Sequence, residues 1–248
     1  YVVDGYFKTD EEARNYKVDQ SFVNQMINAS ALDNGLHAGD LKFVDLDGNN
    51  KIEQTTSAND RKDMKVIGNS LPRYNYNFGI SADWYGIDFS VLFQGIGKQN
   101  WYPGAETSMF WGPYSRPYAS FIPSDFMSQV WSEENTDAYF PRPRGYVALG
   151  SNRELAVVNT KYLQNLAYCR LKNLSIGYTL PDKWLSKIGF EKIRVYFSGE
   201  NLLTFTKLHS DYIDPEQASA SNSWKTSKSD ANIYPWAKTY SFGVDITF

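Results

Sequence analysis

The last nine residues restrict the fold more than any other feature of the sequence. Residues 240–248 read Tyr-Ser-Phe-Gly-Val-Asp-Ile-Thr-Phe, so every second side chain is apolar. A period of two is the pattern of a β-strand with one apolar and one polar face. The strand ends on the aromatic Phe248, as outer-membrane barrels commonly do, whereas soluble domains usually end in frayed polar residues. The pattern therefore favours a membrane barrel over a soluble sandwich.

The same alternation recurs upstream and predicts two hairpins. Residues 74–96 form the first, residues 163–205 form the second, and residues 236–248 form a final strand. Arg194 and Glu200 lie on the polar side of the second hairpin, where full charges are tolerated if that face is wet. A hydrated face of a soluble sheet would explain them as well. The candidates for residues that face an enclosed aqueous lumen are Asn75, Asn77, Arg194, Tyr196 and Glu200.

The connections between these strands alternate in length. Short turns join the strands of each hairpin, whereas residues 97–162 and 206–235 form long connections. Outer-membrane barrels have short periplasmic turns and long extracellular loops. We therefore predict an all-β chain that forms part of a single domain, an antiparallel transmembrane β-barrel that crosses the outer membrane several times. Residues 1–73 would add one strand and another extracellular loop.

The number of predicted strands is too small for a closed barrel. The smallest closed barrels need about eight strands, and the pattern supports about six by the alternation rule. The remaining strands are therefore predicted to precede Tyr1.

Composition argues against several classes of function. The formal net charge is −3, which provides no basic surface for nucleic acid. Cys169 is the only cysteine, so no intrachain disulfide can form. No apolar run approaches the roughly 18 residues of a membrane-spanning helix. His37 and His209 are the only histidines, and neither lies in a nucleophile or zinc motif. We predict no enzyme and no required cofactor.

An acidic loop follows the spacing of a calcium-binding loop. Oxygen-bearing side chains occupy its first, third, fifth and ninth positions, and a backbone carbonyl is available at the seventh. Asn50 replaces the usual glycine, and Asp60 or Asp63 would have to complete the shell. Calcium or another hard divalent cation, and an Asx-rich turn that binds nothing, explain the pattern equally well. The candidate ligands are Asp45, Asp47, Asn49, Lys51, Glu53 and Asp60.

The long connection over residues 97–162 is rich in aromatic side chains. Rigid amphipathic rings make good platforms for sugars or peptides and good interface anchors. A loop of this length also needs a small core of its own, which the same rings could supply. Packing is the more frequent role for any single ring. The candidates for substrate or partner contact are Trp101, Tyr102, Trp111, Tyr114, Arg116 and Tyr118.

Several segments, in the same order along the chain, resemble the C-terminal part of SusC/RagA-family TonB-linked outer-membrane proteins of Bacteroidetes. Each segment alone is weak, but the ordered set is specific. Asn50 and the long spacing from Glu53 to Asp60 depart from the Asp-x-Asn-x-Asp-Gly pattern frequent in that family. The resembling stretches are residues 39–48, 67–74, 93–95, 168–178, 198–202, 214–216 and 240–243.

The resemblance implies a 22-stranded barrel with a plug domain further upstream. It also implies energy supplied through TonB and a SusD-like surface lipoprotein that delivers glycan or peptide. We therefore expect TonB-dependent import of oligosaccharides or peptides by a barrel surrounded by outer-membrane lipid. The alternatives are a passive porin-type barrel and a secreted carbohydrate-binding or hydrolytic β domain.

Overall fold

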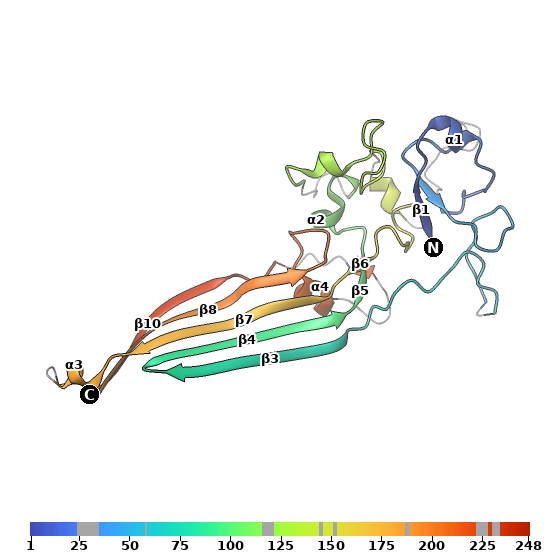
Figure 1. Cartoon of the computed structure of the whole chain (residues 1–248). Coiled ribbons are helices and arrows are strands. Elements are labelled where there is room, and N and C mark those ends of the chain that lie inside the picture. Colours follow the sequence, from blue (N-terminus) through green and yellow to red (C-terminus); the bar gives the residue numbers. More distant parts are fainter. Residues whose placement is uncertain are drawn as a thin grey trace. The chain divides into compact units, whose positions relative to one another are not determined.

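The protein folds into two compact units (Figure 1). Unit 1 comprises the described residues within 1–70, 101–164 and 221–232, and unit 2 those within 71–100, 165–220 and 233–248. In unit 1, the aromatic residues of the long connection enclose a core of their own. The assignment of the whole chain to one barrel domain stays a prediction. The computed structural model describes residues 1–23, 35–57, 59–115, 122–143, 146–150, 153–186, 189–221, 228–229 and 234–248.

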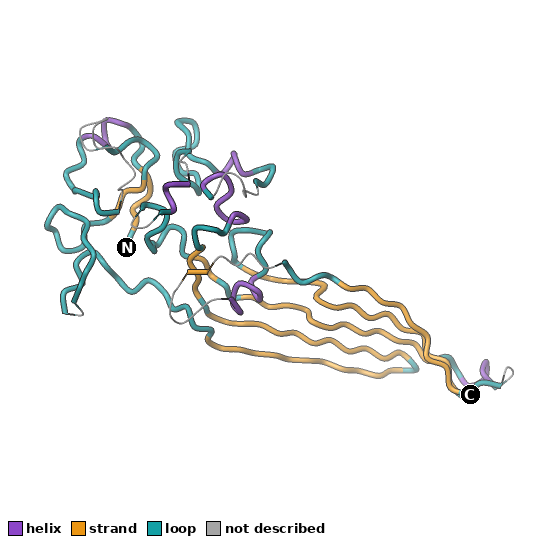
Figure 2. Tube along the Cα trace, turned by 180° about the vertical axis from the view of Figure 1, so that it is seen from behind, coloured by secondary structure: helices purple, strands orange, loops and turns teal. Residues whose placement is uncertain are grey.

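Unit 2 is built on an antiparallel sheet of five strands in the order β10-β8-β7-β4-β3 (Figures 1 and 2). Both predicted hairpins are confirmed, and the final strand pairs with β8. The strands contain between 9 and 15 residues, and about 9–11 tilted residues suffice to cross a bilayer. Their bounds are β3 Arg73–Trp84, β4 Ile87–Lys98, β7 Tyr168–Thr179, β8 Lys192–Thr206 and β10 Thr239–Thr247.

The short connections gather at one end of this sheet. Tyr85 and Gly86 link β3 to β4 with φ values of 47° and 85°, as in the type I′ turns of tight hairpins. A Cβ on Gly86 would lie 2.9 Å from the carbonyl oxygen of Thr179, so the turn requires glycine. Helix α3, Asp182–Leu185, lies in the connection between β7 and β8. The long connections leave from the opposite end, which confirms the predicted alternation.

Unit 1 consists of short elements and long loops. Thr9 caps the start of the first helix, because its Oγ1 accepts a hydrogen bond from the backbone N–H of Glu12 at 3.1 Å. Strand β1 pairs with β2 in antiparallel fashion, and β5 pairs with β9 in parallel. The strands are β1 Val3–Tyr6, β2 Leu41–Phe43, β5 Asn100–Pro103, β6 Gln164–Asn165 and β9 Lys228–Ser229. The helices are α1 Asp10–Arg14, α2 Ser108–Trp111 and the 3-10 turns η1 Gly112–Tyr114, η2 Phe126–Gln129 and η3 Tyr146–Leu149.

A last helix, α4 Pro215–Ser221, follows β8. Within the residues that the structure describes, no helix has the length and apolar character needed to span a membrane.

Candidate functional site

The sheet of unit 2 has one apolar and one polar face. Residues paired across neighbouring strands share a face, and the apolar residues of the five strands are largely paired with one another. On the apolar face, Ile80 is 58% exposed and Phe242 is 84% exposed. An exposed apolar surface that extends over several strands is unfavourable in water and marks contact with a membrane or a partner. The apolar face carries Phe78, Ile80, Phe89, Val91, Leu174, Ile176, Val195, Phe197, Phe242 and Val244.

The polar face carries all five residues that the sequence suggests as lumen-facing. A row of serines crosses it, with one serine contributed by each strand at paired positions. Asn75 and Asn77 share the face of Ser81, and Arg194, Tyr196 and Glu200 share the face of Ser198. Their exposure to an enclosed lumen stays a prediction. The serine row is Ser81, Ser90, Ser175, Ser198 and Ser241.

Arg194 links three strands across this polar face. Its Nε and Nη2 donate to the two carboxylate oxygens of Asp88 on β4 at 2.8 and 2.6 Å, and its Nη1 donates to Asp245 on β10 at 3.1 Å. Gly177 of β7 lies between Arg194 and Asp88, and a Cβ there would approach Asp88 Oδ1 to 2.5 Å. The guanidinium carbon also lies 4.7 Å from the ring centre of Tyr196. The missing side chain at Gly177 therefore allows a bidentate ion pair across an intervening strand.

A second charged cluster fastens α4 to the sheet. Arg170 is 2% exposed, and it donates to Asp214 at 2.6 Å and to Glu216 at 2.8 Å. Lys172 lies 3.1 Å from Glu216, and Thr204 accepts from Arg170 Nε at 2.9 Å. A buried arginine is tolerated only when its charge is paired and its N–H groups are satisfied. The loop after β8 is thus fixed to the polar face of β7.

The aromatic residues predicted to contact substrate or partner lie in the interior of unit 1. Trp101, Tyr102 and Trp111 are 0% exposed and Tyr114 is 1% exposed, which corrects their assignment as contact residues. The two tyrosine hydroxyl groups donate to backbone carbonyls: Tyr102 Oη donates to Leu155 at 2.8 Å, and Tyr114 Oη donates to Pro141 at 2.6 Å. These side chains are buried because a loop of this length needs a core of its own. Arg116 and Tyr118 lie outside the described residues.

The acidic loop brings together three carboxylates, those of Asp45, Asp47 and Asp63, each offering one oxygen within 4.8 Å of the others. Asp63 is fully buried and accepts backbone hydrogen bonds from Leu46 at 2.8 Å and from Glu53 at 2.7 Å. Hard cations prefer such carboxylate oxygens. Occupation of this loop by calcium stays a prediction.

The remaining candidate ligands of the acidic loop have other partners. Asp60 and Glu53 each lie within salt-bridge distance of Lys62, at 3.5 and 3.4 Å, so Asp63 replaces Asp60 in the cluster. Asn50 has a φ of 60°, the left-handed conformation that a glycine usually provides in a calcium loop. Desolvation acts to raise the pKa of Asp45, but backbone N–H groups, foremost that of Asn50, outweigh it and lower the pKa.

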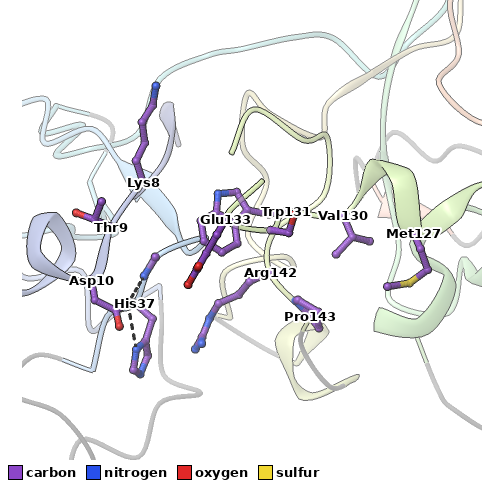
Figure 3. Close-up of a pocket in the computed structure, with 12 residues that line it drawn as sticks. Lys8, Thr9, Asp10, His37, Met127, Val130, Trp131, Glu133, Arg142 and Pro143 are labelled. Atoms are coloured by element: carbon purple, nitrogen blue, oxygen red, sulfur yellow. Dashed lines mark hydrogen bonds and ion pairs between the residues drawn. The ribbon is translucent and has the colours of Figure 1, made fainter. Parts of the chain in front are cut away.

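Unit 1 also contains a cavity of about 840 Å³ (Figure 3). Gly39 packs against two of its lining residues: it has a φ of 82°, and a Cβ there would lie 2.6 Å from the ring of Trp131 and 2.7 Å from the Cβ of Arg142. Arg142 Nε donates to the fully buried Asp40 at 2.7 Å. The walls carry charged groups of both signs beside apolar side chains. Prominent among the lining residues are Lys8, Asp10, His37, Met127, Glu133 and Arg142.

Neither this cavity nor the cluster around Arg170 was predicted from the sequence. The cavity combines residues near positions 10, 37 and 142, and no local spacing connects such distant segments. For the Arg170 cluster the sequence did contain a signal. Arg170 lies in one of the stretches that resemble the family, and Asp214 and Glu216 lie in another. Pairing them requires knowledge of how the loop after β8 returns to the sheet.

Comparison with curated proteins finds three TonB-dependent receptors of Formosa agariphila (strain DSM 15362 / KCTC 12365 / LMG 23005 / KMM 3901 / M-2Alg 35-1). Receptor P3 is 31% identical over 83% of this chain. Receptor P26 is 26% identical over 90%, and receptor P39 is 25% identical over 94%. The matches cover 19%, 21% and 22% of those proteins, so the chain spans about a fifth of their length. These names belong to receptors and not to enzymes. No family model matches the chain.

Two solved structures have a similar fold. The RagAB peptide importer in its open-open state has a TM-score of 0.53 at 23% identity, covering 85% of this chain and 21% of that one. The closed-closed state has a TM-score of 0.51 at 22% identity, covering 79% and 21%. Together with the curated relatives, they agree with the resemblance found in the sequence. The chain is similar to the C-terminal part of a SusC/RagA-type TonB-dependent transporter.

Proposed function

We propose that this chain forms part of the wall and the outer loops of a barrel that imports peptides across the outer membrane. The observation that carries the proposal is the contrast between the two faces of the five-stranded sheet. The apolar face would contact lipid and the charged face would line the import path. A lysine or arginine facing lipid at mid-membrane costs about 2–4 kcal/mol, so Arg194 favours placing the polar face inside.

The edges of the sheet support a larger barrel. Among the described strands, β3 and β10 each have a hydrogen-bonded neighbour on one side only. Unpaired strand edges in hydrocarbon would leave backbone groups unsatisfied. Further strands of the longer protein would therefore pair with β3 and β10, giving the closed, 22-stranded barrel that the family resemblance implies.

The choice of substrate and partners rests on the relatives. The similar solved structures are named as a peptide importer, which favours peptides over oligosaccharides. Energy would arrive through TonB, which would act on a part of the protein outside this chain. A SusD-like surface lipoprotein would cover the long connections 97–162 and 206–235.

The test uses the full-length parent protein in its own bacterium. We expect it in the outer-membrane fraction, and we expect uptake of a labelled peptide that is lost both in a strain lacking the protein and in one lacking TonB. Uptake that persists without TonB would support a passive porin instead. Recovery of the intact protein from the aqueous fraction would contradict the membrane assignment.

A further inference from the structure

We propose that the cavity of unit 1 binds the end of a short peptide, with Arg142 holding the terminal carboxylate. This inference rests on the proposed import function and adds a binding site to it. The cavity lies entirely within unit 1, since all its lining residues belong to that unit. None of these residues was among the sequence-based candidates, so the site is independent of the acidic loop and of the polar face.

We assign the C-terminal carboxylate of the peptide to Arg142 because of the contacts that hold this side chain. Its Nε donates to Asp40, a fully buried carboxylate whose second oxygen accepts the backbone N–H of His37 at 2.9 Å. This contact fixes the plane of the guanidinium and leaves its two terminal nitrogens without a salt-bridge partner among the described residues. The side chain remains 29% exposed. A planar fork that is held in place at Nε suits bidentate recognition of a carboxylate.

Acidic groups in the same cavity supply the opposite charge. Asp10 accepts the backbone N–H of Ala38 at 2.9 Å and lies 3.7 Å from His37 Nδ1. The Ala38 hydrogen bond is the main cause that lowers the pKa of Asp10, so its carboxylate is ionised at neutral pH. Glu133 is an exposed acid that lines the cavity, and Figure 3 shows its side chain extending to the same side as that of Arg142. Acids beside a basic fork favour a zwitterion over a polyanion such as a chain of uronic acids.

The apolar lining and the size define the rest of the ligand. Met127 is 65% exposed, and Val130 and Pro143 also line the cavity. These groups would cover an apolar side chain next to the terminal carboxylate. The volume of about 840 Å³ lies within the range of about 300–1,000 Å³ typical of small-molecule sites, which accommodates a peptide end of two or three residues.

Binding of defined peptides to the detergent-solubilised full-length protein tests the proposal. The probe is the tripeptide alanyl-alanyl-leucine, measured by calorimetry beside its C-terminal amide and its N-acetyl derivative. We expect the amide to bind about tenfold or more weakly, because a charge-assisted hydrogen-bond pair is lost. The N-acetyl derivative should bind about threefold to tenfold more weakly. Equal binding of all three, or tighter binding of a uronate trisaccharide, would overturn the proposal.

Two variants connect these effects to single residues. In Arg142→Gln, the free acid and the amide should bind with affinities within about twofold of each other. In Glu133→Gln, the free peptide and its N-acetyl derivative should likewise bind within about twofold of each other. Arg61→Ala removes an exposed cation outside the cavity and should leave all three affinities unchanged. Glu133 is exposed, so its variant keeps the test valid if Arg142→Gln fails to fold around Asp40.

The transport assay separates the failure of this site from the failure of the proposed function. If TonB-dependent uptake continues while Arg142→Gln still distinguishes acid from amide, the site is wrong and the import function stands. If the wild-type protein shows no TonB-dependent uptake of any peptide, the import function itself fails.

Discussion

The two units use aromatic side chains in opposite ways. In unit 1 the ring of Trp111 is fully buried and lies 4.8 Å from Phe110 and 5.1 Å from Tyr162. In unit 2 the ring of Phe242 is 84% exposed, although it lies 5.2 Å from Phe197 on the neighbouring strand. Similar residue types therefore form an enclosed core in one unit and an open surface in the other.

The difference shows what each unit requires from its surroundings. Unit 1 contains polar loops around buried rings, as a structure stabilised in water does. A single sheet has no second layer to cover its apolar face, so unit 2 needs another apolar phase or partner on that side. Under the proposed function this phase is the lipid of the outer membrane. If the two environments differ in this way, matched changes in the two units should have unequal effects.

The largest effect is expected from alkaline pH on unit 1. Burial is the main cause that raises the pKa of Tyr139 to about 12, and burial also raises the pKa of Tyr6, Tyr102 and Tyr162. An unfolded tyrosine titrates near pH ~10, so stability is full below that pH. It should fall as the pH rises toward 12, and ionisation of the buried phenols should unfold the core.

The measurement is NMR of the parent protein with label on the ring carbon that bears the tyrosine hydroxyl. Tyrosine-to-phenylalanine variants assign the signals. Tyr139, Tyr102 and Tyr162 should titrate together and late, with loss of the native spectrum. Separate titration of Tyr139 close to pH ~10, its unperturbed value, would show that this core is open to water.

Removal of one buried ring should have the next largest effect. Trp111→Ala deletes a fully buried indole whose Nε1 donates to the carbonyl of Gly104 at 3.0 Å. Such truncations cost about 3–5 kcal/mol. Trp84→Ala is the matched change in unit 2, where the indole is 68% exposed, and we expect less than about 1 kcal/mol. Hydrogen exchange of residues 101–115 and 73–98 measures both. Equal losses would remove the contrast between the two units.

A lysine placed on either face of β7 tests the surroundings of unit 2. Ile176→Lys puts a charge on the apolar face and should destabilise the parent protein in lipid vesicles by about 2–4 kcal/mol. Ser175→Lys puts the same charge on the polar face, between Ser90 and Ser198, and should cost less than about 1 kcal/mol. The urea midpoint of the vesicle-bound protein reports both changes. The same loss for both variants would contradict a lipid-facing apolar side.

The strands were predictable from the sequence because alternation determines the face of each residue. Ile176 and Ser175 were separated correctly without any knowledge of their neighbours. The alternation does not reveal β-bulges, such as the register shift between Leu171 and Asn173. It also gives no partner for a charge, so the reach of Arg194 to Asp88 over Gly177 emerged only from the structure.

The loops were less predictable because their contacts depend on distant segments. The aromatic content of residues 97–162 suggested both a core and a contact surface, and burial selects the core for Trp101 and Trp111. The acidic spacing located Asp45 and Asp47 correctly near one another. It did not decide between Asp60 and Asp63, since either could close the loop by chain length alone.

The smallest expected effect concerns calcium in this acidic loop. If a cation binds the three carboxylates, calcium at about tenfold over its dissociation constant stabilises the loop by about 1.4 kcal/mol. Hydrogen exchange of residues 45–57 in the parent protein should slow when calcium replaces a chelator. Asp63→Asn should abolish the slowing because it removes the buried carboxylate of the cluster. Asp60→Asn is the control. That carboxylate contacts Lys62, so its removal should leave calcium binding within about twofold.

The opposite result would restore Asp60 as the ligand and place the cation on the exposed side of the loop. No change with calcium in the wild-type protein would identify the sequence as an Asx-rich turn, held together by backbone hydrogen bonds to carboxylates, such as the two to Asp45 at 2.7 Å and the two to Asp63.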